Sequence, residues 1–110
     1  MAGVRDWNNA VSEGTILAGS LRSAAVTLST TAQALSSTSI PILWVIIENV
    51  GTVNVYIGGS SVANSGSSRG ILIRPNGETP PLSINDLSQV FAIAASGTPD
   101  ILYIAGIYPA

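Results

Sequence analysis

The chain contains no cysteine, no histidine and no lysine among its 110 residues. Without cysteine there are no disulfides and no thiolate ligands for a metal, so apolar burial and backbone pairing must hold the fold. Serine nucleophiles are activated most often by histidine, and in one variant by lysine, so both of these routes are closed. A zinc site would have to be built from carboxylates alone. We therefore predict no enzymatic activity, no cofactor and no metal site.

Charge of either sign is scarce, at 9% of residues against about 25% in a typical soluble protein. The net charge is −2 and only four arginines are basic, which argues against nucleic-acid binding because a phosphate backbone needs a clustered positive stripe. A nearly neutral surface does little to keep copies of a protein apart. This composition favours a protein that works in an assembly, and the alternative is a soluble domain coated with Ser, Thr and Asn.

The six acidic residues are scattered singly, at Asp6, Glu13, Glu48, Glu78, Asp86 and Asp100. We interpret Asp86 and Asp100 as turn residues whose side chains bond nearby backbone N–H groups. Glu48 stands in a mostly apolar segment, and we interpret it as an edge-facing charge or as the partner of an arginine.

Long apolar runs are also missing. The longest, residues 40–47, contains Pro41 and is far shorter than the ~20 residues that span a bilayer, so no membrane partner is expected. The first thirty residues show no basic start followed by a sustained apolar run, so no signal peptide is expected either.

What is present from Ser23 onward is a series of short apolar runs separated by turn residues. Alternation in 53–57 is typical of a half-buried strand, while 42–47 is apolar on both faces and indicates a central strand covered on both sides. Asn76-Gly77 predicts a tight turn, and a Gly-Thr-Pro segment predicts a hairpin between 87–95 and 101–108. We predict an all-β domain at 23–110, with about eight short antiparallel strands in a β-sandwich or jelly roll.

Residues 1–22 have no clean period and are predicted to form an extended N-terminal arm that packs on another surface. Its apolar residues are the candidate contacts: Val4, Trp7, Val11, Ile16 and Leu17. A frayed terminus is the alternative, since chain ends are commonly poorly ordered. Trp7 favours the arm, because large aromatics supply much of the binding energy at interfaces.

The last predicted strand, 101–108, is apolar on both of its faces, as is 42–47. A two-layer domain of this size has one inner layer, so part of this apolar surface must be covered from outside. A homo-oligomer is the simplest cover. The candidate oligomer contacts are Trp44, Tyr103 and Tyr108.

Three segments resemble small virion proteins of tailed bacteriophages, of the capsid decoration (cement) and head-fibre type. They are AQALSSTSIP at 32–41, VIIENVGTVNVYIGGSSV at 45–62 and GILIRPNGETPPLSINDLSQVFAIAA at 70–95. The resemblance covers roughly residues 25–106. It departs at Pro80-Pro81, where such proteins continue an ordinary strand, and at the arm, which lies outside the matching region. It implies a β-sandwich or jelly roll, commonly a trimer, on the capsid surface.

The resemblance and the composition together predict a structural virion protein that binds the phage head and is made in the bacterial host cytoplasm. Its expected partners are the major capsid protein, contacted through the arm, and further copies of itself as a homotrimer. One alternative is a head- or tail-fibre module for host attachment, with the Gly/Ser-rich loop 58–70 as its binding surface. A minor hydrolase or adhesin is a third alternative.

Overall fold

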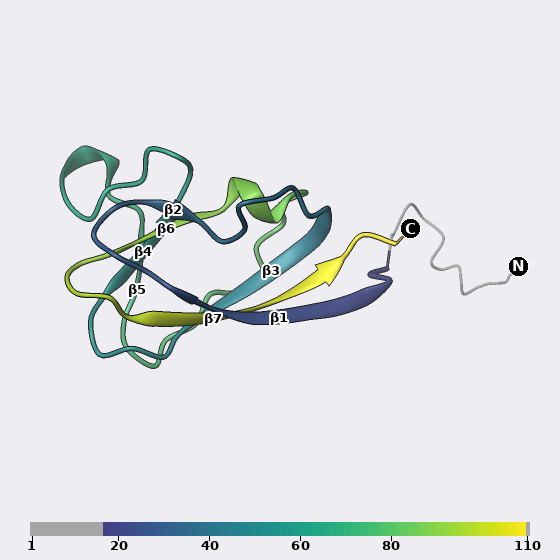
Figure 1. The fold of residues 1–110 in the computed structure, drawn as a ribbon, viewed down its shortest axis with the longest axis horizontal. Helices are drawn as coiled ribbons and strands as arrows, with labels where there is room; N and C mark the ends of the chain where they lie inside the picture. Colours follow the sequence, from purple (N-terminus) through teal and green to yellow (C-terminus); the bar gives the residue numbers. More distant parts are fainter. Residues whose placement is uncertain (1–16, 110) are drawn as a thin grey trace, which may run out of the picture.

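The computed structural model describes residues 17–109, and these residues form two antiparallel β-sheets (Figure 1). One sheet has the order β1-β7-β3, with β1 at Ser20–Thr27, β7 at Asp100–Ile107 and β3 at Ile42–Asn49. The other has the order β2-β6-β4-β5, with β2 at Gln33–Ala34, β6 at Phe91–Ala94, β4 at Val55–Gly58 and β5 at Ile71–Ile73. Two short 3₁₀ turns, η1 at Gly66–Ser68 and η2 at Leu87–Gln89, complete the elements. The predicted all-β class is confirmed, with seven strands rather than eight in this part of the chain.

The core lies between the two sheets, and strand alternation explains which residues enter it. In β7, Ile101, Tyr103 and Ala105 are buried while Leu102 is exposed, the period of two that a strand imposes. Both sheets contribute to a single buried cluster, which includes Val45 and Ile47 from β3, Val55 and Ile57 from β4, and Ala92 and Ala94 from β6. This shared cluster makes the two layers a β-sandwich.

β1 begins at Ser20, so the last three residues of the predicted 1–22 arm belong to the first sheet. The other predicted arm residues from 1 to 16 lie outside the described part of the chain.

The prediction that 42–47 is a central strand was wrong. β3 lies at the end of its sheet, and its second edge is covered by the irregular segment 77–82. Val45 and Leu82 exchange backbone hydrogen bonds of 3.0 and 2.8 Å, and Thr79 N donates to Ile47 O at 2.8 Å. Pro80 and Pro81 have no N–H groups to donate, so this segment contacts β3 without forming a strand. An irregular segment of this kind satisfies the hydrogen-bonding groups along the edge of β3. It leaves no signal in the pattern of apolar residues within β3 itself.

The predicted hairpin between the last two strands was also wrong, because β6 and β7 belong to different sheets. The residues between them carry the chain from one layer to the other, with Gly97 at a positive φ of 64°. Glycine and proline signals mark a change of direction, but a turn within one sheet and a crossing between layers use the same residues.

The Asn76-Gly77 turn is present as predicted. Asn76 adopts a left-handed φ of 66°, and Gly77 N donates to Arg74 O at 2.8 Å. Asn76 N also donates to Asn49 O at 2.8 Å, so the turn brings the chain from β5 back to the end of β3.

Asp86 caps η2 and joins it to the segment before β3. Its carboxylate accepts from Ser88 N at 2.9 Å and Ile40 N at 3.1 Å, and also from the hydroxyls of Ser39 and Ser88. This confirms the predicted turn role, whereas the bond that the structure shows for Asp100 comes from Thr27 Oγ1 at 2.6 Å. The hydrogen bond from Ser39, together with those from Ser88, holds the pKa of Asp86 well below its ordinary value.

Asp86→Ala is therefore expected to lower the melting temperature at neutral pH, with an effect that shrinks in acid. Because the pKa of Asp86 is depressed in the folded state, its contribution is complete above the ordinary aspartate pKa of about 3.9 and is lost as the pH falls further. The difference in melting temperature between the variant and the unchanged protein is measured by circular dichroism, from pH 7 down to the lowest pH at which the unchanged protein still folds. Asp100→Ala, which removes one side-chain partner, is the matched control and should have the smaller effect at neutral pH. An equal loss of melting temperature at every pH would contradict the stabilising role assigned to the ionised Asp86 carboxylate.

Candidate interaction surfaces

Residues 17–109 bring together no group of three or more His, Cys, Asp or Glu side chains that could hold a metal ion. In the same part of the chain, no helix is long and apolar enough to cross a membrane. The absence of enzymatic activity stays a prediction from composition. The candidate functional features of the described residues are two apolar surfaces.

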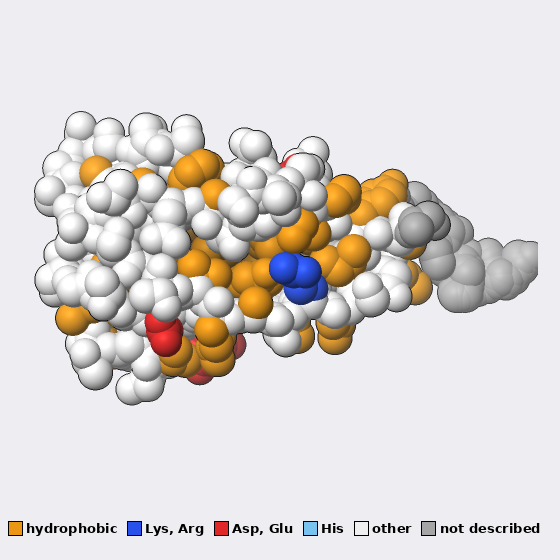
Figure 2. All heavy atoms as spheres, viewed as in Figure 1, with side chains coloured by type: hydrophobic (Ala, Val, Ile, Leu, Met, Phe, Trp, Pro, Cys, Tyr) orange, Lys and Arg blue, Asp and Glu red, His pale blue; other side chains and the backbone are white. Residues whose placement is uncertain are grey.

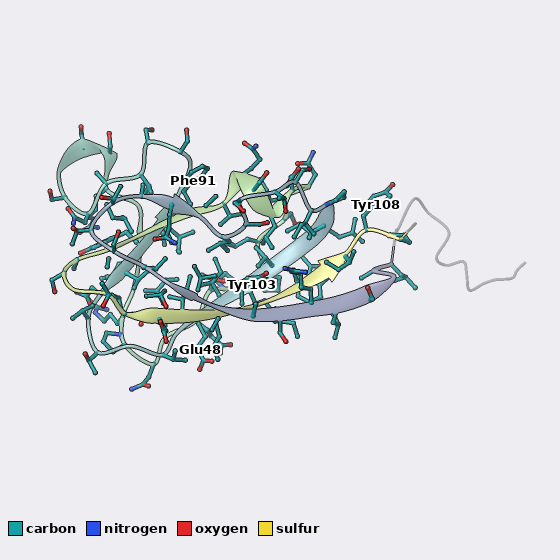
Figure 3. All side chains as sticks on the ribbon, viewed as in Figure 1. Glu48, Phe91, Tyr103 and Tyr108 are labelled. Carbon is teal, nitrogen blue, oxygen red and sulfur yellow. The ribbon has the colours of Figure 1, made fainter. Side chains whose placement is uncertain are left out.

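The first, which we name the outer sheet face, is the side of the β1-β7-β3 sheet that points away from the core. Tyr103 and Glu48 leave this sheet on opposite sides, Tyr103 toward the core and Glu48 toward the outer face (Figure 3). The strand registers place three rows of residues on the outer sheet face: Leu21, Gly106 and Trp44; Ser23, Ile104 and Ile46; Ala25, Leu102 and Glu48.

This face is mostly apolar and stays in contact with solvent. Leu21 is 64% exposed and Leu102 is 42% exposed, while Ile46 and Ile104 between them are half-buried. Glu48 is the one charged residue in these three rows, and Glu78 of segment 77–82 lies opposite it at the edge of the face. Contiguous apolar area of this kind on a soluble protein commonly marks a site of interaction with another protein.

Trp44 is fixed on the outer sheet face by the glycine opposite it. A Cβ built on Gly106 would lie 2.5 Å from Trp44 Nε1 and 3.0 Å from the Cβ of Ala18. Only glycine therefore leaves room for the indole over β7. The half-buried ring extends the apolar surface beyond what the aliphatic residues provide.

The second surface, which we name the β5 groove, lies between β5 and segment 78–84 and has a volume of about 530 Å³. Most of its lining is apolar, including Ile57, Ile71, Ile73, Pro80, Leu82, Ile84 and Val90. Ile71 is 75% exposed. The groove lies beside β5, whereas the outer sheet face lies on the other sheet, so the two surfaces are separate.

Those predicted contact residues that the structure describes lie in different parts of the fold. Val4, Trp7, Val11 and Ile16 lie outside the described residues, and Leu17 is exposed just before β1. Trp44 is on the outer sheet face. Tyr103 is buried, and its hydroxyl accepts from Arg22 Nε at 2.9 Å. Tyr108 is 47% exposed beyond the end of β7 (Figure 3).

Loop 58–70 is folded back on the second sheet. It contains η1 and a bridge between Ala63 and Arg69, and Asn64 Nδ2 donates to Ala94 O at 3.1 Å. The Arg69 guanidinium lies 5.4 Å from the centre of the Tyr56 ring, within the range of a cation–π interaction. The charged side chain of the loop, although exposed, is therefore already in contact with another residue of the same chain.

Leu21 was not predicted as part of the outer sheet face, because it falls within the predicted 1–22 arm. The sequence signal for this surface was available in β7. Because β7 is apolar on both of its faces, apolar residues are expected beside it on the outer face as well as on the core side.

Comparisons with known proteins found no matching protein-family model and no matching curated protein.

Proposed function

We propose that this protein is a structural component of a tailed-phage virion, a decoration protein that binds and stabilises the assembled head. The observation that carries the proposal is the outer sheet face, a mostly apolar surface whose charges, Glu48 and Glu78, lie together at one edge, on a protein that has few charges elsewhere. The resemblance of 32–41, 45–62 and 70–95 to small tailed-phage virion proteins of the decoration and head-fibre type supplies the biological setting. Host cytoplasm is the expected place of synthesis, and the head surface the place of function.

Burial energetics favour an assembled state. Removing apolar surface from water contributes about 25 cal/mol per Å², so a face such as this one gains stability when another protein covers it. Leu21, Leu102 and Trp44 are the residues that gain most, because they combine large side chains with exposure. More charged residues would be expected on this face in a protein that remains monomeric.

In this proposal the two parts of the chain have different partners. Residues 1–16 bind the major capsid protein, with Trp7 as the main anchor, and the β-sandwich contacts other copies. The resemblance implies a trimer as the oligomer. A fibre module with 58–70 as its receptor-binding loop has less support, because Arg69 is held against Tyr56.

The test is binding to purified heads that lack this protein, measured by co-sedimentation. Binding of the full chain to the heads is expected to saturate at a fixed ratio to the major capsid protein. Trp7→Ala is expected to weaken binding at least tenfold, which corresponds to about 1.4 kcal/mol, while the control Asn8→Ala leaves it unchanged. A variant with residues 1–16 replaced by a Gly/Ser sequence of equal length should keep its circular dichroism spectrum and lose binding.

Undiminished binding by the Gly/Ser variant would refute the role of the arm. A full chain found in only a few copies per virion, and at the tail or on fibres, would refute decoration and support the fibre module.

A further inference from the structure

β1 presents a long open strand edge. Its eight residues pair with β7 along one side, from Ser20 opposite Ile107 to Thr27 opposite Asp100. Along its other side no residue of the described chain forms a strand pair. Unpaired backbone N–H and C=O groups in a row are a template for a further strand.

The other sheet edges in residues 17–109 are closed or short. The free side of β3 is covered by segment 77–82. In the second sheet the edge strands β2 and β5 have only two and three residues. β1 is therefore the edge on which strand addition would give the most hydrogen bonds.

The direction of the backbone groups in β1 follows from its pairing. Leu28 N donates to Pro99 O at 2.8 Å, and hydrogen-bonded positions in an antiparallel pair recur at every second residue. Counting back from Leu28, Ala24 and Val26 bond to β7, while Ser23 and Ala25 turn their N–H and C=O groups toward the open edge.

β1 lacks most of the devices that protect natural edges. Its sequence SLRSAAVT has no proline and no lysine, and its register with β7 is continuous without a bulge. The one such device is Arg22, an exposed residue whose side chain lies on the inner side of the sheet, where Nε donates to Tyr103 Oη. The small side chains of Ser23, Ala24 and Ala25 leave the edge accessible.

An apolar strip accompanies this edge. In the view of Figure 1, β1 runs along the near side of the molecule. In the same view, Figure 2 shows hydrophobic side chains gathered between β1 and the second sheet. Ala24 and Val26 are half-buried and pack on the core from the inner side of β1. A partner along β1 would cover this strip as well as the backbone groups.

We propose that β1 pairs antiparallel with β1 of a second copy, joining two three-stranded sheets into one of six strands. A second copy fits because β1 is complementary to itself. A two-fold axis perpendicular to the sheet keeps the two outer sheet faces on the same side of the joint sheet. Even-numbered residues must then lie opposite even-numbered residues of the second copy, and odd-numbered opposite odd-numbered. With Ala24 opposite Ala24 of the second copy, residues 21–27 pair and Arg22 faces Val26. The neighbouring register centred on Ser23 brings the two Arg22 side chains onto a diagonal, and the one centred on Ala25 shortens the overlap.

This pairing goes beyond decoration, because it is independent of whether the protein binds a head. It also differs from the trimer that the resemblance implies. The two outer sheet faces become continuous, which doubles the apolar surface available to a third protein.

The absence of cysteine makes a direct test possible. In Ala24→Cys the two thiols would face each other in a non-hydrogen-bonded pair, with Cα atoms about 4.5 Å apart, within the range for a disulfide. Mild oxidation is expected to convert most of this variant into a species of twice 11.2 kDa on a non-reducing gel. Ser60→Cys, an exposed loop position, is the control and should remain largely monomeric.

Two further variants separate pairing from folding. Ala25→Pro removes an N–H that points to the open edge and so keeps the bonds to β7, while Ser23→Lys adds an edge charge. Both are expected to weaken dimerisation at least tenfold in analytical ultracentrifugation, with an unchanged circular dichroism spectrum for Ser23→Lys.

Several results would overturn the proposal: a monomer at all concentrations, a trimer, or equal cross-linking of Ala24→Cys and Ser60→Cys. A dimer that survives Ser23→Lys and Ala25→Pro would place the contact elsewhere. A dimer lost on deletion of 1–16, without cross-linking at Ala24, would show that residues 1–16 occupy the edge instead.

Discussion

Replacing Asn49 with alanine is expected to lower the free energy of unfolding by about 3 kcal/mol. Asn49 is fully buried at the end of β3, where Nδ2 donates to Val53 O at 2.8 Å and to Ile73 O at 2.9 Å. Its Oδ1 accepts from Gly51 N at 3.0 Å. One side chain thus joins the end of β3 in the first sheet to β5 and the approach to β4 in the second. Alanine leaves these backbone groups without their partner and opens a cavity.

A loss of this size is a large part of the 5–15 kcal/mol that stabilises a typical domain. Urea unfolding measures it, and the midpoint should fall while the slope stays constant. Asn85→Ala, at an exposed position, is the matched control and should change stability by less than about 0.5 kcal/mol. Similar values for the two variants would show that the Asn49 hydrogen bonds do not stabilise the contact between the sheets.

Gly70→Ala is expected to cost about 2–3 kcal/mol by overpacking. A Cβ on Gly70 would lie 2.4 Å from Ile57 O and 2.6 Å from Val62 Cγ2. The first of these atoms is backbone within β4 and cannot rotate away. Gly70 N also donates to Ala63 O at 3.1 Å, so moving the glycine would break the bond that closes loop 58–70.

Gly59→Ala is the control for this effect, since a Cβ there has no neighbour within 4 Å. Both variants remove the conformational freedom of one loop glycine, so only the contact with Ile57 and Val62 distinguishes them. The two melting temperatures should therefore separate clearly, with Gly59→Ala close to the unchanged protein. If Gly70→Ala melts together with Gly59→Ala, the close approach of residue 70 to β4 is not present in solution.

The all-β class could be predicted because alternation and turn residues are local properties. The arrangement of the strands could not, because partners are chosen by tertiary packing. β3 shows the difficulty: its apolar residues on both faces suggested a central place, yet segment 77–82, with its two prolines, covers its edge. The link from β6 to β7 shows it again, since its glycine and proline do not specify which sheet the chain enters.

The candidate surfaces could be predicted from the sequence only in part. Alternation in β7 correctly separates Tyr103 from Leu102, but both sets are apolar, so the sequence does not tell which side is the core. Tyr103 is buried in the core, and its hydroxyl accepts a hydrogen bond from Arg22, a residue that had been assigned to the arm. The Trp44 position depends on Gly106, a contact across two strands that only the fold brings together.

In the proposed β1 pairing, the covered edge of β3 would determine where assembly stops. A chain with two open edges could add copies without limit and grow into a fibre. Here segment 77–82 already bonds to Val45 and Ile47, so a copy that joins through β1 meets a closed edge on each far side of the joint sheet. Under that proposal, segment 77–82 with Pro80 and Pro81 would stop further strand addition, so β1 pairing would give a particle of fixed size.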